Sequence, residues 1–193
     1  MIRAIVGLGN PLPQYIKTRH NFGRMAVEAL REKENLEWKS HFWKNYRWCQ
    51  TNCGTWLAIS KTYMNTSGEA VRSLARSLKL APEEILVLLD DCQLPLGKLR
   101  YRHAGSDGGH NGLRSVIACL GTEDVPRLRL GIGKSPLPLV EHVLGNFEAE
   151  EQETVAAAIN FLTNRLPKVS SDEEKIINEI NNWRAPAYAD ASN

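Results

Sequence analysis

Short, nearly continuous apolar runs divide the chain into segments that fit strands buried on both faces of a sheet. The run over residues 2–8 ends at Gly9-Asn10-Pro11, and the run over residues 85–89 ends at Asp90-Asp91. Runs of this length, bounded by turn residues, are typical of buried strands. Further strands are expected in residues 36–60, where two or three fit, and at residues 99–103 and 128–132.

Apolar residues at helical spacing predict five helices between and after these strands. Their apolar stripes begin at Phe22, Val71, Leu113, Val155 and Ile176. Alternating strands and helices favour an α/β fold. We therefore expect one domain over residues 1–193, a three-layer sandwich in which helices flank a mixed, twisted sheet. Residues 185–193 are rich in Ala, Asp and Ser and predict a frayed tail.

Composition narrows the class of protein. With 193 residues, 42% of them hydrophobic and 24% charged, the chain is globular rather than disordered or fibrous. No apolar run approaches the roughly 18 residues of a membrane span, and the N-terminus resembles a strand rather than a signal peptide. We expect a cytoplasmic monomer.

Charge is unevenly distributed along the chain. Residues 1–134 carry 20 Lys/Arg against 12 Asp/Glu, whereas residues 135–193 carry 4 against 10. This imbalance indicates either an anionic ligand such as nucleic acid on the basic part or an ordinary solvated surface.

The sequence lacks the motifs of several common types of binding and catalytic site. Leu12 stands where a dinucleotide fingerprint beginning at Gly7 needs its third glycine, and there is neither a P-loop nor a G-x-S-x-G elbow. The cysteines lack the second close pair of a zinc site, so we expect no metal and reduced thiols that are buried or half-buried. These are Cys49, Cys53, Cys92 and Cys119.

Candidate polar residues follow the predicted strands, where open α/β sheets bind ligands. Asn10 and Asp90 lie at two strand ends, and His20 precedes a helix beyond the Asn10 loop. A lone histidine is more often structural than catalytic. Asn65 or Ser67 could simply cap a helix. The loop over residues 105–112 feeds a helix N-terminus, which is either an anion site or a plain turn.

Together, these segments resemble one family. The bacterial-type peptidyl-tRNA hydrolases share, in this order, VGLGNP (residues 6–11), YxxTRHN (15–21), TYMNxSG (62–68), LPLGKLR (94–100), GSxGGHNGLRS (105–115), RLRLGIG (127–133) and VLGNF (143–147). Three departures are visible. Ile59-Ser60-Lys61 lacks the family's usual proline before Thr62, Gln93 replaces a second aspartate, and Phe22-Gly23-Arg24 replaces the commoner Val/Ala-Gly-Phe. None removes a position that the family uses for chemistry.

The resemblance implies hydrolysis of the ester between a peptide and the 3′-terminal ribose of tRNA. His20 is then the general base that activates water, because an imidazole is largely neutral at cellular pH. Asp90 orients its ring, and Asn10 or Asn111 assists the oxyanion or the water. Asn65 and Asn111 hold the substrate, Tyr15 and Met64 form pocket walls, and His110 acts behind these groups or as a gate.

The resemblance also implies tRNA as the partner, without metal or organic cofactor. Arg102 and Arg129, with Lys98 nearby, are expected to contact tRNA phosphates. Two alternatives remain open. An RNA-binding module that lost catalysis would lack His20 or Asp90, and both are present. A nucleosidase or phosphorylase would need a phosphate or nucleobase site that no motif supplies.

Overall fold

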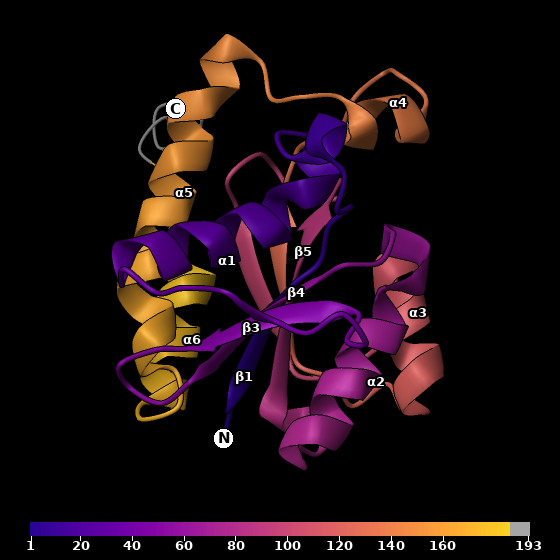
Figure 1. Cartoon of the computed structure of the whole chain (residues 1–193). Coiled ribbons are helices and arrows are strands. Elements are labelled where there is room, and N and C mark those ends of the chain that lie inside the picture. The colour runs from indigo at the N-terminus through magenta and orange to yellow at the C-terminus, as the bar shows by residue number, and fades with distance from the viewer. Residues whose placement is uncertain (186–193) are drawn as a thin grey trace.

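Seven strands form one mixed sheet in the order β2-β3-β4-β1-β5-β7-β6 (Figure 1). The computed structural model describes residues 1–185. Strands β4, β1, β5 and β7 run parallel, whereas β2, β3 and β6 are antiparallel to their neighbours. The expected mixed sheet is confirmed, and residues 36–60 supply three strands. The strands are β1 (Ala4–Gly7), β2 (Lys39–Ser40), β3 (Tyr46–Gln50), β4 (Trp56–Ser60), β5 (Ile85–Asp91), β6 (Leu99–Arg102) and β7 (Arg127–Gly131).

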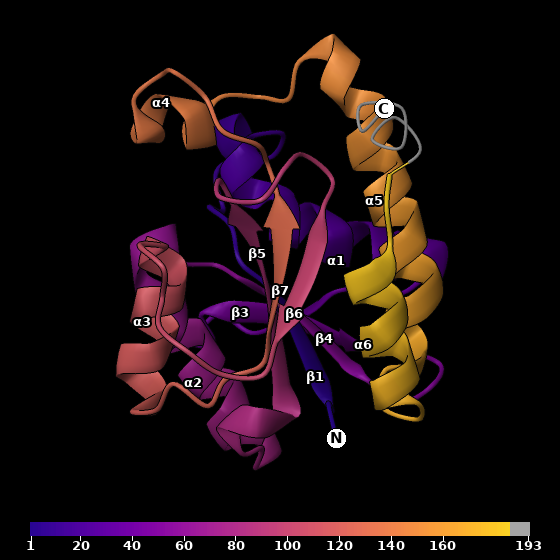
Figure 2. The ribbon, with the colours of Figure 1, turned by 180° about the vertical axis from the view of Figure 1, so that it is seen from behind.

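Helices cover both faces of the sheet, as the predicted sandwich requires (Figures 1 and 2). Helices α1 (Phe22–Lys33), α5 (Gln152–Arg165) and α6 (Glu173–Asn182) bury their apolar stripes on one face. Helices α2 (Ser67–Leu78) and α3 (Asn111–Leu120) cover the other. Along β1, Ile5 points into the first layer and Val6 into the second. This alternation explains why the strand is apolar at every position.

One helix escaped the sequence analysis. Helix α4 (Leu139–Leu144) follows β7, and its only buried residue is His142. Leu139 and Val140 face outward, so the segment lacks the inward apolar stripe by which the other helices are recognised. Side chains of this helix line one wall of a cleft beside Asp90.

Two smaller expectations are corrected. Ala185, predicted to begin a frayed tail, is buried, while residues 186–193 lie outside the described part of the chain. Cys53 is exposed in the turn between β3 and β4, whereas Cys49 is buried and Cys92 and Cys119 are half-buried. Among residues 1–185, no helix packs over the hairpin turn that holds Cys53, and the residues around this cysteine do not predict that exposure.

Close packing between α1 and β5 determines where the site can form. A Cβ atom on Gly23 would lie 2.1 Å from the carbonyl oxygen of Leu88, so only glycine lets the helix approach this closely. The helix start is thereby held against the end of β5. Within residues 1–185, no helix combines the length and apolar character needed to cross a membrane.

Candidate active site

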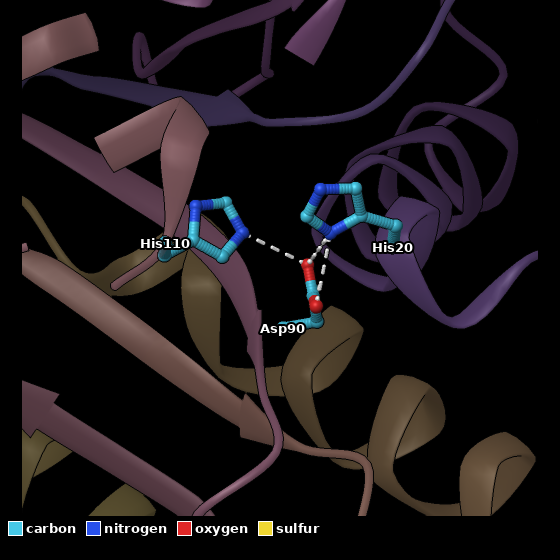
Figure 3. A group of neighbouring side chains, drawn as sticks. All are labelled: His20, Asp90 and His110. Atoms are coloured by element: carbon cyan, nitrogen blue, oxygen red, sulfur yellow. Dashed lines mark hydrogen bonds and ion pairs between the residues drawn. The ribbon is translucent and has the colours of Figure 1, made fainter. Parts of the chain in front are cut away.

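A buried carboxylate lies at the centre of the site. Asp90, at the carboxyl end of β5, is 3% exposed. The Nδ1 atom of His20 lies 2.9 and 3.0 Å from its two oxygens, and Nε2 of His110 lies 3.0 Å from Oδ1 (Figure 3). One aspartate therefore binds two histidines that come from opposite sides of the sheet end.

Three segments deliver these side chains. His20 belongs to a short 3-10 helix, η2 (Arg19–Asn21), which leads directly into α1. His110 ends the glycine-rich loop as the N-cap of α3. Gly108 and Gly109 in that loop have φ angles of 60° and 85°, a backbone region that glycine adopts without strain. The loop can therefore turn sharply and bring His110 over the end of β5.

The hydrogen bonds determine which ring nitrogen carries each proton. The backbone N–H of Leu113 donates to Nδ1 of His110 at 3.2 Å, so that atom holds a lone pair. The proton of neutral His110 is therefore on Nε2, from which it is donated to Asp90. In His20, Nδ1 faces Asp90 and carries the proton, which leaves the lone pair on Nε2. Of the two rings, His20 therefore has the basic nitrogen that no hydrogen bond within residues 1–185 occupies.

Electrostatics keep Asp90 ionised. Burial alone would raise the pKa of this carboxyl. The positive charge that His110 carries when protonated and its hydrogen bond, followed by the hydrogen bond and the corresponding charge of His20, outweigh that effect and hold the pKa of Asp90 well below its ordinary value. The carboxylate is thus a permanent acceptor for both rings and can stabilise an imidazolium.

The same three side chains raise the question of a metal ion. Their nearest ligand atoms all lie within 4.8 Å of one another. A metal bound to Nε2 of His110 would force the ring proton onto Nδ1, which already accepts from the N–H of Leu113. The arrangement therefore suits an acid–base group better than a metal site.

Reciprocal contacts hold Asn10, which is buried and does not line the cleft beside Asp90. Its backbone N–H donates to Oδ1 of Asn21, and Nδ2 of Asn21 donates to its carbonyl, at 2.8 and 3.0 Å. The side-chain Oδ1 of Asn10 accepts from the backbone N–H of Met64 at 2.9 Å. No hydrogen bond within residues 1–185 uses its Nδ2 group, which remains able to donate.

A cleft of about 100 Å³ opens beside Asp90, and it unites some of the predicted residues but not others. It is lined by His20, Asp90, His110, Asn111 and Arg129, together with Asp91, Asp107 and the apolar side of α4. The remaining predicted substrate residues lie outside this lining: Met64 is buried, Asn65 is exposed and Tyr15 is half-buried.

The helix-capping alternative for Asn65 and Ser67 is not supported. Thr66 occupies the N-cap position of α2, and its side chain makes no capping hydrogen bond. Asn65 makes no side-chain hydrogen bond within the described chain, and Ser67 is buried against the sulfur of Met64. The exposed amide of Asn65 therefore remains available to a ligand.

The predicted phosphate-binding residues occupy different surroundings. Arg129 forms an ion pair with Asp91, at 2.7 Å from Nε to Oδ2, although the N–H is not aimed for a regular hydrogen bond. Arg102 is exposed on β6, on the same sheet face as Arg129 by strand alternation. Lys98 instead donates to the carbonyl oxygen of Asn181 at 2.8 Å, which turns it toward α6.

Two supporting arginines were not found from the sequence. Buried Arg127 donates to the carbonyl of Gly105 at 2.7 Å and so holds the glycine-rich loop. Buried Arg19 pairs with Glu151 at 2.6 Å, and its backbone N–H donates to Gly145, which ties η2 to the segment after α4. Partners that are distant in the sequence bury these charged side chains, so no local sequence pattern reveals their role. For Arg19, the one available hint was its position next to His20.

Comparison with known proteins places this geometry in a family. The peptidyl-tRNA hydrolase family model matches residues 4–188. A peptidyl-tRNA hydrolase of Synechocystis is 46% identical over 169 residues, covering 83% of this chain and 86% of the relative. One of Clostridium perfringens is 38% identical, covering 92% and 96%. The crystal structure of the Acinetobacter baumannii peptidyl-tRNA hydrolase superposes with a TM-score of 0.87 at 32% identity, covering 95% and 96%.

Proposed function

Because the chain belongs to the peptidyl-tRNA hydrolase family, we propose that it cleaves its substrate with a water molecule activated by His20. The reaction hydrolyses the ester between a peptide, or an N-blocked aminoacyl group, and the 3′-terminal ribose of tRNA. It releases free tRNA and the peptide. An ester of this kind is already activated, so one general base and a few positioned polar groups suffice.

His20 supplies the base through Nε2. Its other nitrogen, Nδ1, donates to Asp90 at 2.9 Å, and this bond fixes both the tautomer and the ring orientation. When Nε2 takes a proton from water, the ionised carboxylate of Asp90 stabilises the resulting imidazolium. This uncommitted lone pair beside a buried, ionised aspartate is the observation that carries the proposal.

His110 supports this pair without acting as a second base. Its Nε2–H group donates to Asp90, and its only lone pair is taken by the N–H of Leu113. Asp90 is thereby held between two rings and cannot rotate away from His20. These contacts support the role of a supporting group over that of a gate, and we assign His110 as a positioning residue.

Amide groups are suited to the developing oxyanion. Asn111 lines the cleft at the first turn of α3, where backbone N–H groups and the helix dipole favour negative charge. Its Oδ1 accepts from Arg114 at 3.2 Å, which directs its N–H groups to other partners. Asn10 also keeps its Nδ2 group available. We assign Asn111 and Asn10 to the oxyanion and water, and Tyr15, Met64 and Asn65 to the substrate.

We assign the binding of the tRNA part of the substrate to the arginines of β6 and β7. Arg102 is exposed, and Arg129 borders the cleft, so the two could bind successive phosphates near the acceptor end. Lys98 is assigned a lesser share because Asn181 already binds its ammonium group. Such contacts recognise the backbone rather than the base sequence, which suits an enzyme that acts on many tRNAs. We place this activity in a cytoplasmic monomer.

The decisive experiment incubates the protein with an N-acetyl-aminoacyl-tRNA and follows free tRNA. We expect turnover by the wild type and almost none by His20→Ala. Binding without turnover by the wild type would instead identify an RNA-binding module. Release of a free nucleobase would identify a nucleosidase.

A further inference from the structure

Exposed apolar side chains gather at the edge of the sheet that holds the active site. Among residues 1–185, all of the large apolar side chains that are well exposed, apart from Met1, belong to segments that adjoin the carboxyl ends of the parallel strands. Exposed apolar side chains that contact one another mark interaction sites, whereas single ones need no explanation. The residues are Ile16, Phe42, Trp43, Tyr63, Leu137, Leu139, Val140 and Leu144.

The loop between β2 and β3 carries the most exposed of them. Phe42 is 92% and Trp43 66% exposed. The Trp43 ring stacks on His41 with 4.7 Å between centroids and meets Phe42 edge to face at the same distance. We call residues His41–Trp43 the aromatic ledge. Mutual stacking holds these rings in a defined shape although solvent surrounds them.

Hydrogen bonds anchor the aromatic ledge to the active-site edge. The Nζ of Lys61, just beyond β4, donates to the carbonyl of His41 at 3.0 Å, and its backbone N–H donates to Asn45 at 2.8 Å. Tyr46 at the start of β3 pairs with Ser60 at the end of β4. The ledge therefore projects from the same sheet edge as Asp90.

The sheet order separates this ledge from the arginines assigned to tRNA. Relative to β5, strands β7 and β6 with Arg129 and Arg102 lie on one side, and β1, β4 and β3 lie on the other. A substrate whose ester lies at His20 extends from it in two directions, with the tRNA on one side (the tRNA arm) and the peptide on the other (the peptide arm). If the tRNA arm runs over the arginines, the peptide arm leaves toward β4 and β3.

We propose that the aromatic ledge binds apolar side chains of the peptide arm of longer peptidyl-tRNAs. This inference rests on the proposed function. From β5 to β3 there are three strand steps, or about 14 Å at ~4.8 Å each. An extended peptide covers that distance in about four residues, at ~3.5 Å per residue. An N-acetyl-aminoacyl group is too short to reach the ledge.

The two lysines that contact the ledge or its loop already bind groups of the protein. The Nζ of Lys44 is committed to the hydroxyls of Tyr46 and Ser77, at 2.7 and 2.8 Å. Lys61 is likewise bound to the carbonyl of His41. The most exposed side chains of the ledge, Phe42 and Trp43, are uncharged aromatic rings, which favours apolar peptide side chains over phosphates.

The test compares a double variant, Phe42→Ser with Trp43→Ser, with the wild type on three substrates. These are N-acetyl-phenylalanyl-tRNA, a hexapeptidyl-tRNA with apolar N-terminal residues, and a hexapeptidyl-tRNA with Gly and Ser there. Leu137→Ser is the matched control, because Leu137 is 56% exposed but follows β7 on the other side of β5.

We expect kcat/KM on the apolar hexapeptide to fall about 5- to 20-fold, through KM, in the double variant only. The other two substrates should change less than about twofold. An unchanged apolar hexapeptide would overturn the proposal. Equal losses on all three substrates would assign the ledge to tRNA, and a dimer that the double variant converts to monomers would make it a self-association surface. Failure of the wild type on N-acetyl-phenylalanyl-tRNA would instead refute the proposed function.

Discussion

The imidazole rings of His20 and His110 lie 4.9 Å apart between centroids, tilted by 51°, because both bind the same oxygen of Asp90. The two imidazole rings thus share one carboxylate but differ in whether their remaining nitrogen lone pair is available. His20 presents a lone pair to the cleft, whereas the lone pair of His110 is bound by the N–H of Leu113. This asymmetry makes His20 the base and His110 the supporting residue.

Replacing His20 should affect turnover far more than binding. We expect His20→Ala to lower kcat about 10²- to 10⁴-fold, the usual cost of losing a general base. Binding of uncleaved tRNA should stay close to wild type, since the phosphate contacts lie on β6 and β7. Single-turnover hydrolysis and equilibrium binding would check both. Near-normal hydrolysis would remove His20 from the role of base.

Replacing His110 should cost both rate and stability. His110→Ala removes the N-cap acceptor of α3, which is worth about 1 kcal/mol, and one of the donors to Asp90. We expect kcat to fall about tenfold, well short of the His20→Ala loss, because the base itself remains. Denaturant melts and kcat would be measured together. A rate loss equal to that of His20→Ala would mean that His110 transfers protons itself.

The two neighbouring aspartates should behave differently. Asp90→Asn keeps the size of the side chain but cannot stabilise an imidazolium, so kcat should fall substantially, though less than for His20→Ala. Asp91 binds Arg129 instead, so Asp91→Asn should be milder and act mainly on KM. Both variants would be compared on one N-blocked aminoacyl-tRNA. The reverse order would show that the dyad was placed wrongly by one residue.

The stability that Asp90 contributes should not change with pH near neutrality. Because the pKa of Asp90 is depressed in the folded protein, its contribution to stability is complete above the ordinary carboxyl range, near pH ~4, and is lost only as pH falls further. Between pH 5.5 and 8.5 we therefore expect Asp90 to contribute a constant amount to the unfolding free energy. Denaturant melts of the wild type and of Asp90→Asn across this range would check it. A difference in unfolding free energy between the two proteins that shrinks from pH 8.5 to pH 5.5 would contradict the depressed pKa of Asp90.

The arginines should affect tRNA substrates selectively. Arg102→Ala and Arg129→Ala should raise KM and flatten its salt dependence, by roughly one unit of log–log slope for each phosphate that the variant no longer binds. Lys98→Ala should do less, because Asn181 holds that ammonium group. Minimal ester substrates without the tRNA body should be cleaved normally. Equal damage to both substrate classes would place the arginines at the reaction centre.

Much of the fold followed from local patterns. Strands such as β5 are apolar at successive positions because both faces are covered, and α2 shows one apolar stripe because only one side is. Asp90 and Asn10 could be nominated because polar residues directly after buried strands collect at one sheet edge. Helix α4 was missed because its apolar residues face outward, so that its pattern resembles a loop.

The sequence by itself determined the strand and helix faces, the polar residues at the strand ends and the family resemblance, because each of these depends on neighbouring residues or ordered motifs. Only the tertiary structure decided that His20 and His110 share Asp90, that Met64 is buried and that Lys98 turns toward Asn181. Such contacts join segments far apart in the chain, and their geometry depends on how the helices pack across the sheet. The close approach of Gly23 to Leu88 is one such packing detail, and it sets the position of the helix that begins beside His20.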